Sequence, residues 1–358
     1  MKATQQRHEF GQSLWLDHIT RELLNSGTLK RWSEELSVTG LTSNPCAFYG
    51  AIKNGTCYDA AIRQKLHEDK MGAELYYDIA LEDLRHAADL FGPVYEKSDG
   101  VDGWVSLEVS PFLTHDPQCT LTLVKDLFAR LRRPNIFIEI PGTNEGLWAV
   151  EEAIFAGIPV NVTLLYSREH YLAAAGAFLR GIERRIVAGF KPDVGSVVSI
   201  SVSPWDAAVR GRVPDALRNK LGVAVARRTY KACCESMISP RWQRAYNAGA
   251  RPQRLRWTGT EIVDAGGPGD FYIRSLAAPF SVITVSEKNL NALAQSDDIA
   301  VSMPCDGGDC EVVLACFAAA GIDIDDLAVN LQAQGAAAAV ISWIGLLSGI
   351  ASRSAALV

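Results

Sequence analysis

Short apolar runs rich in valine and isoleucine alternate along the chain with longer segments of helical periodicity. Eight such runs are predicted to be strands: 13–17, 38–43, 105–109, 136–141, 160–165, 197–202, 255–259 and 281–285. Their near-continuous apolar character is typical of parallel strands that are buried on both faces. Helical patterns fill most of the gaps, as at 145–156, 169–188 and 215–237. Eight strand–helix units predict an α/β fold that closes into a (β/α)8 barrel.

A doubly wound open sheet is the alternative architecture. It would place a glycine-rich phosphate loop after the first strand, and the sequence at 17–20, Asp-His-Ile-Thr, is nothing like one. The chain has no linker, internal repeat or low-complexity tract, so we expect one domain over residues 1–358. A glycine-rich segment at 265–269 is expected to be a flexible loop at the end of the barrel where active sites lie.

Composition and charge narrow the range of partners. The net charge is −6 and there is no long basic run, which disfavours nucleic acid and anionic membranes. The polar N-terminus lacks an apolar signal segment, so a cytoplasmic location is expected. The apolar stretch 335–351 is short for a membrane span, and we expect a helix packed on the body or on a second copy in a homodimer. The eight cysteines lack zinc spacing and are expected to be reduced thiols.

Polar residues gather at the ends of the predicted strands, where barrel enzymes place their chemistry. A buried carboxylate is costly unless it is paired, so three of them on separate strands predict a catalytic cluster and not three salt bridges at the rim: Asp17, Glu108 and Glu139. Six other residues are predicted to bind a small-molecule substrate: Asn44, Asn161, Thr163, Ser199, Ser201 and Thr258. No histidine falls at a strand end, and His18 is expected to face the helix layer, so neither a metal nor another cofactor is expected.

Several blocks of the sequence resemble the transaldolase family: Ser-Leu-Trp-Leu-Asp at 13–17, Thr-Gly-Leu-Thr-Ser-Asn-Pro at 39–45, and the segments 99–109, 134–143 and 151–167. The resemblance covers nearly the whole chain. It implies a barrel with extra C-terminal helices, in an enzyme that moves a dihydroxyacetone unit between sugar phosphates through a lysine Schiff base. It also implies that Asp17 transfers protons, that Glu108 works with a water, and that four polar residues hold donor hydroxyls and that water: Asn44, Asn161, Thr163 and Ser199.

The sequence departs from the family pattern at the reacting centre. Glu139 stands where the family has its Schiff-base lysine, and no lysine lies in a predicted strand. Pro204 and Gly259 stand at the places of phosphate ligands, for which an arginine elsewhere would have to compensate: Arg210, Arg212 or Arg274. With no cation expected nearby, at least one of the three carboxylates is predicted to hold a proton near neutrality. Alternatively, a divalent cation or an amine on the substrate would offset the repulsion among the three carboxylates.

Three functional hypotheses follow from these observations. The retained polar residues favour an enzyme that works by acid–base chemistry without a lysine Schiff base, such as a cyclisation, isomerisation, dehydration or imine-free aldol step. Its substrate would be a small, polar, non-phosphorylated intermediate of specialised biosynthesis. The alternatives are a catalytically inactive relative that binds a partner, and a true transaldolase.

Overall fold

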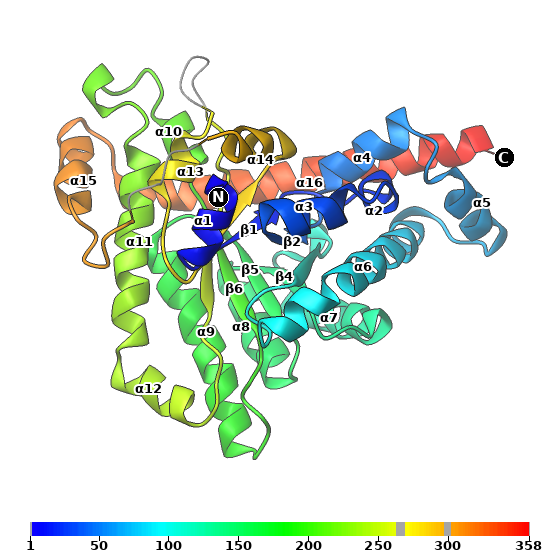
Figure 1. The fold of residues 1–358 in the computed structure, drawn as a ribbon, viewed down its shortest axis with the longest axis horizontal. Helices are drawn as coiled ribbons and strands as arrows, with labels where there is room; N and C mark the ends of the chain where they lie inside the picture. The colour runs from blue at the N-terminus through cyan, green and yellow to red at the C-terminus, as the bar shows by residue number, and fades with distance from the viewer. Residues whose placement is uncertain (1, 263–268, 297–301, 358) are drawn as a thin grey trace.

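Eight parallel strands form a closed barrel in sequence order (Figure 1). The computed structural model describes residues 2–262, 269–296 and 302–357 of the protein. Each observed strand lies within one residue of a predicted one, which confirms the (β/α)8 barrel over the open sheet: β1 Gln12–Leu16, β2 Val38–Thr42, β3 Trp104–Glu108, β4 Ile136–Pro141, β5 Val160–Leu165, β6 Ser196–Ser201, β7 Arg254–Thr258 and β8 Ser281–Val285. Of the predicted loop at 265–269, residues 265–268 lie outside the described residues.

Helices surround the barrel and extend its C-terminal part. The first half of the chain contributes α1 Ala3–Glu9, α2 Arg21–Asn25, α3 Thr28–Leu36, α4 Pro45–Asn54, α5 Asp59–His67, α6 Gly72–Lys97, η1 Pro111–Leu113, α7 Pro117–Leu131, α8 Asn144–Phe155 and α9 Arg168–Val187. The second half contributes α10 Ser203–Ala208, η2 Asp215–Leu217, α11 Leu221–Met237, α12 Pro240–Asn247, α13 Phe271–Ser275, α14 Glu287–Ala294, α15 Cys310–Ala319 and α16 Ile324–Leu357. The helices α8 and α9 confirm the patterns predicted at 145–156 and 169–188.

The helix predicted at 215–237 is divided in two, which corrects the sequence-based prediction. A short 3-10 turn precedes α11, and Asn219 between them has a φ of 56°, a left-handed conformation that ends a helix. The Asp206 carboxylate then accepts hydrogen bonds from the backbone N–H groups of Leu221 (2.9 Å) and Gly222 (3.1 Å). Since these first amides of α11 have no partner within the helix, the carboxylate of α10 fixes where α11 begins.

The apolar stretch at 335–351 belongs to α16, a helix of 34 residues that packs on the body of the protein against α4, α5 and α6 (Figure 1). By length and composition, α16 is the one helix within the described residues that could cross a membrane. In the structure the Trp343 side chain is fully buried, with its ring 5.0 Å from Tyr76 and 5.8 Å from Tyr77. The Gln332 amide donates to the backbone oxygen of Gly142, which follows β4, and to that of Leu164, near the end of β5.

An apolar layer fills the half of the barrel interior nearer the N-terminal ends of the strands, which is called the lower half here. Its inward side chains are Trp15, Trp104, Phe137, Val197 and Val282. The rings of Trp104 and Phe137 stack with centroids 3.9 Å apart. A Cβ atom at Gly40 would lie 2.6 Å from the Trp15 indole nitrogen, so the close approach of this indole requires glycine on β2. The open part of the interior therefore lies above this layer, toward the C-terminal ends of the strands.

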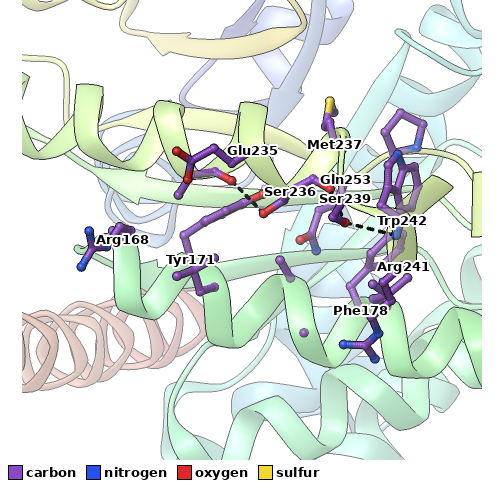
Figure 2. Close-up of a pocket in the computed structure, with 16 residues that line it drawn as sticks. Arg168, Tyr171, Phe178, Glu235, Ser236, Met237, Ser239, Arg241, Trp242 and Gln253 are labelled. Carbon is purple, nitrogen blue, oxygen red and sulfur yellow. Dashed lines mark hydrogen bonds between the residues drawn. The ribbon is translucent and has the colours of Figure 1, made fainter. Parts of the chain in front are cut away.

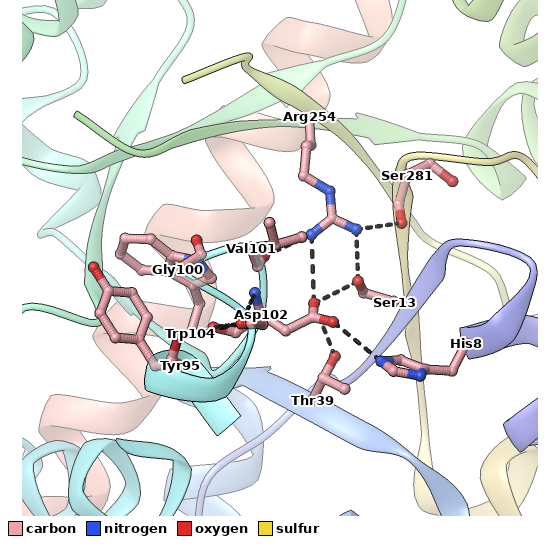
Figure 3. A network of polar contacts seen from close by, with 11 residues as sticks. His8, Ser13, Thr39, Tyr95, Gly100, Val101, Asp102, Trp104, Arg254 and Ser281 are labelled. Atoms are coloured by element: carbon pink, nitrogen blue, oxygen red, sulfur yellow. Dashed lines mark hydrogen bonds and ion pairs between the residues drawn. The ribbon is translucent and has the colours of Figure 1, made fainter. Parts of the chain in front are cut away.

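Below the apolar layer, a buried ion pair ties the N-terminal segment to the barrel (Figure 3). The Asp102 carboxylate accepts hydrogen bonds from Ser13 Oγ at 2.5 Å and Thr39 Oγ1 at 3.2 Å, and it lies 3.3 Å from His8 Nε2. Arg254 Nη1 lies 3.4 Å from the same carboxylate. Both charged side chains are almost fully buried. At this end of a barrel such residues are expected to serve stability and not catalysis.

We expect Asp102→Ala to lower the free energy of unfolding by about 3–5 kcal/mol, because it leaves the buried Arg254 charge without a partner. Urea denaturation measures this change. The matched control is Asp89→Ala, which breaks an exposed pair with Arg133 and should cost less than about 1 kcal/mol. Equal losses in the two variants would contradict a structural role for the buried pair.

Candidate active site

A polar layer above the apolar floor has Glu139 at its centre. The strand register places Glu139 of β4 level with Glu108 of β3 and Asn161 of β5. Glu139 is 6% exposed, and its Oε1 accepts hydrogen bonds from Thr42 Oγ1 at 2.5 Å and Ser106 Oγ at 2.6 Å. Two donors on one oxygen offset part of the cost of burying the charge and hold the carboxylate in one orientation.

Asn161 of β5 connects the hydrogen bonds of Glu139 to those of β6. Its Nδ2 donates to Ser106 Oγ at 3.0 Å, and its Oδ1 accepts from Ser199 Oγ at 2.6 Å. The hydrogen bonds therefore run in one direction, from Ser199 through Asn161 and Ser106 to Glu139. Asn161 is fully buried and is not among the residues that line the cavities of the barrel mouth. The structure places this residue to orient Glu139, where the sequence predicted contact with a substrate.

A buried arginine faces the carboxylates, and the sequence-based expectation that no cation lies near them is wrong. Arg256, in the middle of β7, is 4% exposed, and its Nη1 lies 3.8 Å from Glu139 Oε1. Its guanidinium also lies 5.8 Å from the ring of Trp15 in the floor. The positive charge of Arg256 partly offsets the negative charge of the carboxylates.

The guanidinium of Arg256 keeps its hydrogen-bonding capacity free. Neither Nε nor Nη1 donates to any of the described residues, although both atoms are buried. An unpaired buried donor costs about 1–3 kcal/mol, so this arrangement is expensive for folding alone. Arginine carries five N–H donors in a fixed plane, which suits the oxygens of a bound ligand.

Burial, and then the negative charge of Glu139, raise the pKa of Glu108 to about 8, while Arg256 acts in the opposite direction. Glu108 ends β3 and is half-buried. A raised pKa means that the side chain is mostly protonated at neutral pH and loses its proton as the pH rises through about 8. The sequence-based prediction of one protonated carboxyl in the cluster therefore applies to Glu108, which is suited to act as a general acid.

Asp17 lies at the mouth, directly after β1, with its side chain 36% exposed. His18 Nδ1 lies 2.9 Å from Asp17 Oδ1, so His18 contacts a predicted catalytic residue and does not simply face the helix layer. This contact corrects the expectation for His18.

Two adjoining cavities of about 180 and 360 Å³ occupy the mouth, and both are bordered by Glu108, Glu139, Arg256 and Thr258. The smaller cavity is also lined by Thr163, Ser199 and Ser201, and by Ala339 of α16. The larger one is also lined by Asp17 and Asn44, whose Oδ1 caps the first turn of α4. Of the nine predicted site residues, the structure brings eight to these cavities and leaves out Asn161.

The lining residues also limit what the site could bind. None of the three arginines considered for an anion site borders either cavity; Arg274, for instance, pairs with Asp270 at 2.5 Å. Among the described residues, no lysine lines either of these cavities. Within the described residues there is also no group of three or more His, Cys, Asp or Glu side chains that could hold a metal ion.

A further cavity of about 490 Å³ lies on the outer side of the barrel, between α9, α11 and α12 (Figure 2). Tyr171, Phe178 and Trp242 supply its apolar walls. Its charged residues belong to the outer helices, and two of them are paired: Arg168 with Glu169 and Arg241 with Glu183. Because the inward groups of the strands do not reach this cavity, we place the candidate active site at the barrel mouth and not here.

The fold is a (β/α)8 barrel with a carboxylate-lined cavity at the C-terminal ends of its strands, the place where barrel enzymes have their active sites. Residues 14–350 match the family model for transaldolase/fructose-6-phosphate aldolase. The chain is 37% identical to a transaldolase of Parafrankia sp. over 95% of both chains, and 38% identical to one of Thermobifida fusca over 98% of both. It is 36% identical to a transaldolase of Arthrobacter sp. over 97% of this chain and 96% of the other. The protein belongs to the transaldolase/fructose-6-phosphate aldolase family.

These relatives overturn the hypothesis of an acid–base enzyme for a specialised, non-phosphorylated intermediate, and they support the alternative of a true transaldolase. The hypothesis gave one substituted position, Glu139, more weight than the similarity of the whole chain. It also assumed a mouth without a cation, where the structure places Arg256. That Glu139 replaces the family's Schiff-base lysine rests on the motif around it and stays a prediction.

Proposed function

We propose that the protein is a transaldolase, which transfers a dihydroxyacetone unit from a ketose phosphate to an aldehyde acceptor at the mouth of the barrel. The observation that carries the proposal is the 36–38% identity to proteins named transaldolase over nearly the whole length of both chains. The polar residues of the mouth are consistent with it, because sugar substrates present many hydroxyl groups to be bound.

The reaction breaks the bond between C3 and C4 of the ketose and forms the same bond to the acceptor aldehyde. The proton of the C4 hydroxyl passes to a carboxylate as the bond breaks, and the bonding electrons stay with the three-carbon unit. These electrons then form the new bond, and the acceptor oxygen takes up a proton. The first half of the cycle therefore needs a group that accepts a proton and the second half needs one that donates it, and the two groups return to their starting states by proton exchange with water.

The proposal divides these tasks among the residues of the mouth. Glu108, protonated near neutrality, donates a proton, and Asp17 accepts one at the solvent side. Arg256 borders both cavities, and its guanidinium is assigned to stabilise a substrate oxygen on which negative charge develops. Glu139, held by Thr42 and Ser106, keeps the guanidinium of Arg256 in place.

A coupled assay with fructose 6-phosphate as donor and erythrose 4-phosphate as acceptor tests the proposal. We expect glyceraldehyde 3-phosphate to appear, and to depend on the acceptor. Glyceraldehyde 3-phosphate formed without acceptor would indicate an aldolase instead. Absence of any product from the folded protein would overturn the proposal.

Adding borohydride during turnover tests the residue assignment separately. Protein of unchanged mass is expected from cavities that no lysine lines. A reduced adduct that maps to a lysine would show that a lysine reaches the donor carbonyl. The assignment to Arg256 would then fail, while the proposed transaldolase activity would stand.

A further inference from the structure

Two cysteines that are far apart in the sequence meet at one tyrosine hydroxyl, outside the candidate active site. Tyr230 and Cys234 lie one turn apart on α11, so their side chains extend from the same face of the helix. Cys305, in the segment before α15, places its Sγ 3.9 Å from the Tyr230 hydroxyl. Cys234 extends from the same helix face as Tyr230, so both thiols lie beside this tyrosine, and each thiol affects the ionisation of the group next to it.

The two thiols differ in accessibility in a way that suits stepwise oxidation. Cys305 is exposed to solvent, and Cys234 is half-buried. The neighbouring Cys233 is buried on the other side and contacts Tyr171. A reagent in solution therefore meets Cys305 before Cys234.

We propose that Cys234 and Cys305 are a site of reversible oxidation by low-molecular-weight disulfides, which converts the pair into an internal disulfide between α11 and the segment before α15. In the first step the Cys305 thiolate attacks the disulfide and releases one thiol, which leaves a mixed disulfide on Cys305. In the second step the Cys234 thiol gives up its proton and its sulfur attacks Cys305 Sγ, releasing the second thiol. Two protein thiols are oxidised, and one external disulfide is reduced to two thiols.

The environment of Cys234 favours this order. Burial, together with the hydrogen bond and charge of Cys305, raises the pKa of Cys234 to about 12, so the reduced Cys234 is a poor nucleophile at neutral pH. Once Cys305 is part of a mixed disulfide, it no longer carries an ionisable thiol. Two of the causes that raise the pKa of Cys234 are then removed. The pKa of Cys234 therefore falls, and its thiolate forms more readily once Cys305 carries the mixed disulfide that it attacks.

The inference does not depend on the proposed function, and its test needs no substrate. Fully reduced protein is incubated with oxidised glutathione, quenched with acid, alkylated and mapped by mass spectrometry. We expect a link between Cys305 and Cys234 in the wild-type protein, and no lasting glutathione on Cys305. In Cys234→Ser, glutathione should stay on Cys305, because the attacking sulfur is missing.

Two matched variants complete the experiment. Cys233→Ala should form the link as the wild type does, which separates Cys234 from its neighbour in the same peptide. Cys316→Ser removes an exposed cysteine of α15 and should change nothing at the pair. Glutathione that persists on Cys305 in the wild type, or a link that survives in Cys234→Ser, would overturn the proposal.

The link should also stabilise the fold reversibly. It closes a loop of the chain between positions 234 and 305, so it restricts the unfolded chain and should raise the midpoint of thermal unfolding. Dithiothreitol should return the midpoint to that of the reduced protein. A linked protein that unfolds at a lower temperature would show that the two thiols must be forced together, against the geometry on which the proposal rests.

Discussion

Replacing Arg256 by methionine is expected to lower kcat/KM for sugar transfer by at least about 100-fold while leaving the protein folded. The loss follows from removing a positioned donor that faces a developing negative charge, an interaction that contributes about 2.7–4 kcal/mol where it has been measured in enzymes. Stability should fall, because the buried Glu139 carboxylate then lacks the cation that lies 3.8 Å away, so activity is compared on protein shown to be folded. Steady-state kinetics and thermal unfolding on the same preparations separate the two effects.

Two further variants test whether activity requires only the positive charge of Arg256 or also its planar set of donors. Arg256→Lys keeps the charge but lacks the planar set of donors, so we expect only partial recovery of activity. Arg274→Met removes an arginine that pairs with Asp270 away from both cavities, and it should remain close to wild type. An Arg256→Met enzyme that works as well as Arg274→Met would remove Arg256 from the mechanism.

Activity should be lost as the pH rises through about 8, because Glu108 then gives up the proton that it donates. Because the pKa of Glu108 is raised, its carboxyl stays protonated below about pH 8. The alkaline limb of the pH–rate profile is therefore expected to follow the deprotonation of Glu108. Glu108→Gln should lower kcat by about 100-fold or more and abolish this limb, since glutamine cannot donate a proton in catalysis.

Glu139 supplies a direct check on the origin of the raised pKa. Its charge is the second cause of the shift after burial, so Glu139→Gln should move the alkaline limb to lower pH. Arg256→Met removes the opposing positive charge and should move the limb to higher pH. Glu145→Gln, at an exposed position on α8, is the matched control and should leave the limb in place. A limb that stays fixed in all of these variants would show that another group controls it.

The barrel could be predicted from the sequence because buried parallel strands leave a strong local signal. The polar ends of these strands were equally visible, and eight of the nine predicted site residues border the mouth cavities. Arg256 was missed, although β7 carries a signal in its alternation: Arg254, Arg256 and Thr258 are polar, whereas Leu255 and Trp257 between them are apolar. Reading a two-residue period along that strand would have placed both arginines on the inward face.

Other features could not be found by any local pattern. The buried pair of Asp102 and Arg254 joins positions that only the closed barrel brings together, and Cys305 meets the face of α11 that carries Cys234 only through the packing of the helices. Asn161 was correctly recognised as a polar residue of a strand end, but its buried position depends on side chains from β3 and β6. The sequence indicates which residues are polar, whereas their partners depend on the register and closure of the sheet.

The position of α16 at the C-terminal end of the chain has a consequence for synthesis on the ribosome. The barrel closes only when β8 pairs with β1, which joins Gln12 to Ser281, and α16 emerges after that point. Until then Tyr76 and Tyr77 lack the Trp343 ring that covers them in the finished protein. A nascent chain that pauses before α16 would therefore hold a closed barrel with an uncovered aromatic surface, which is the kind of surface that chaperones bind.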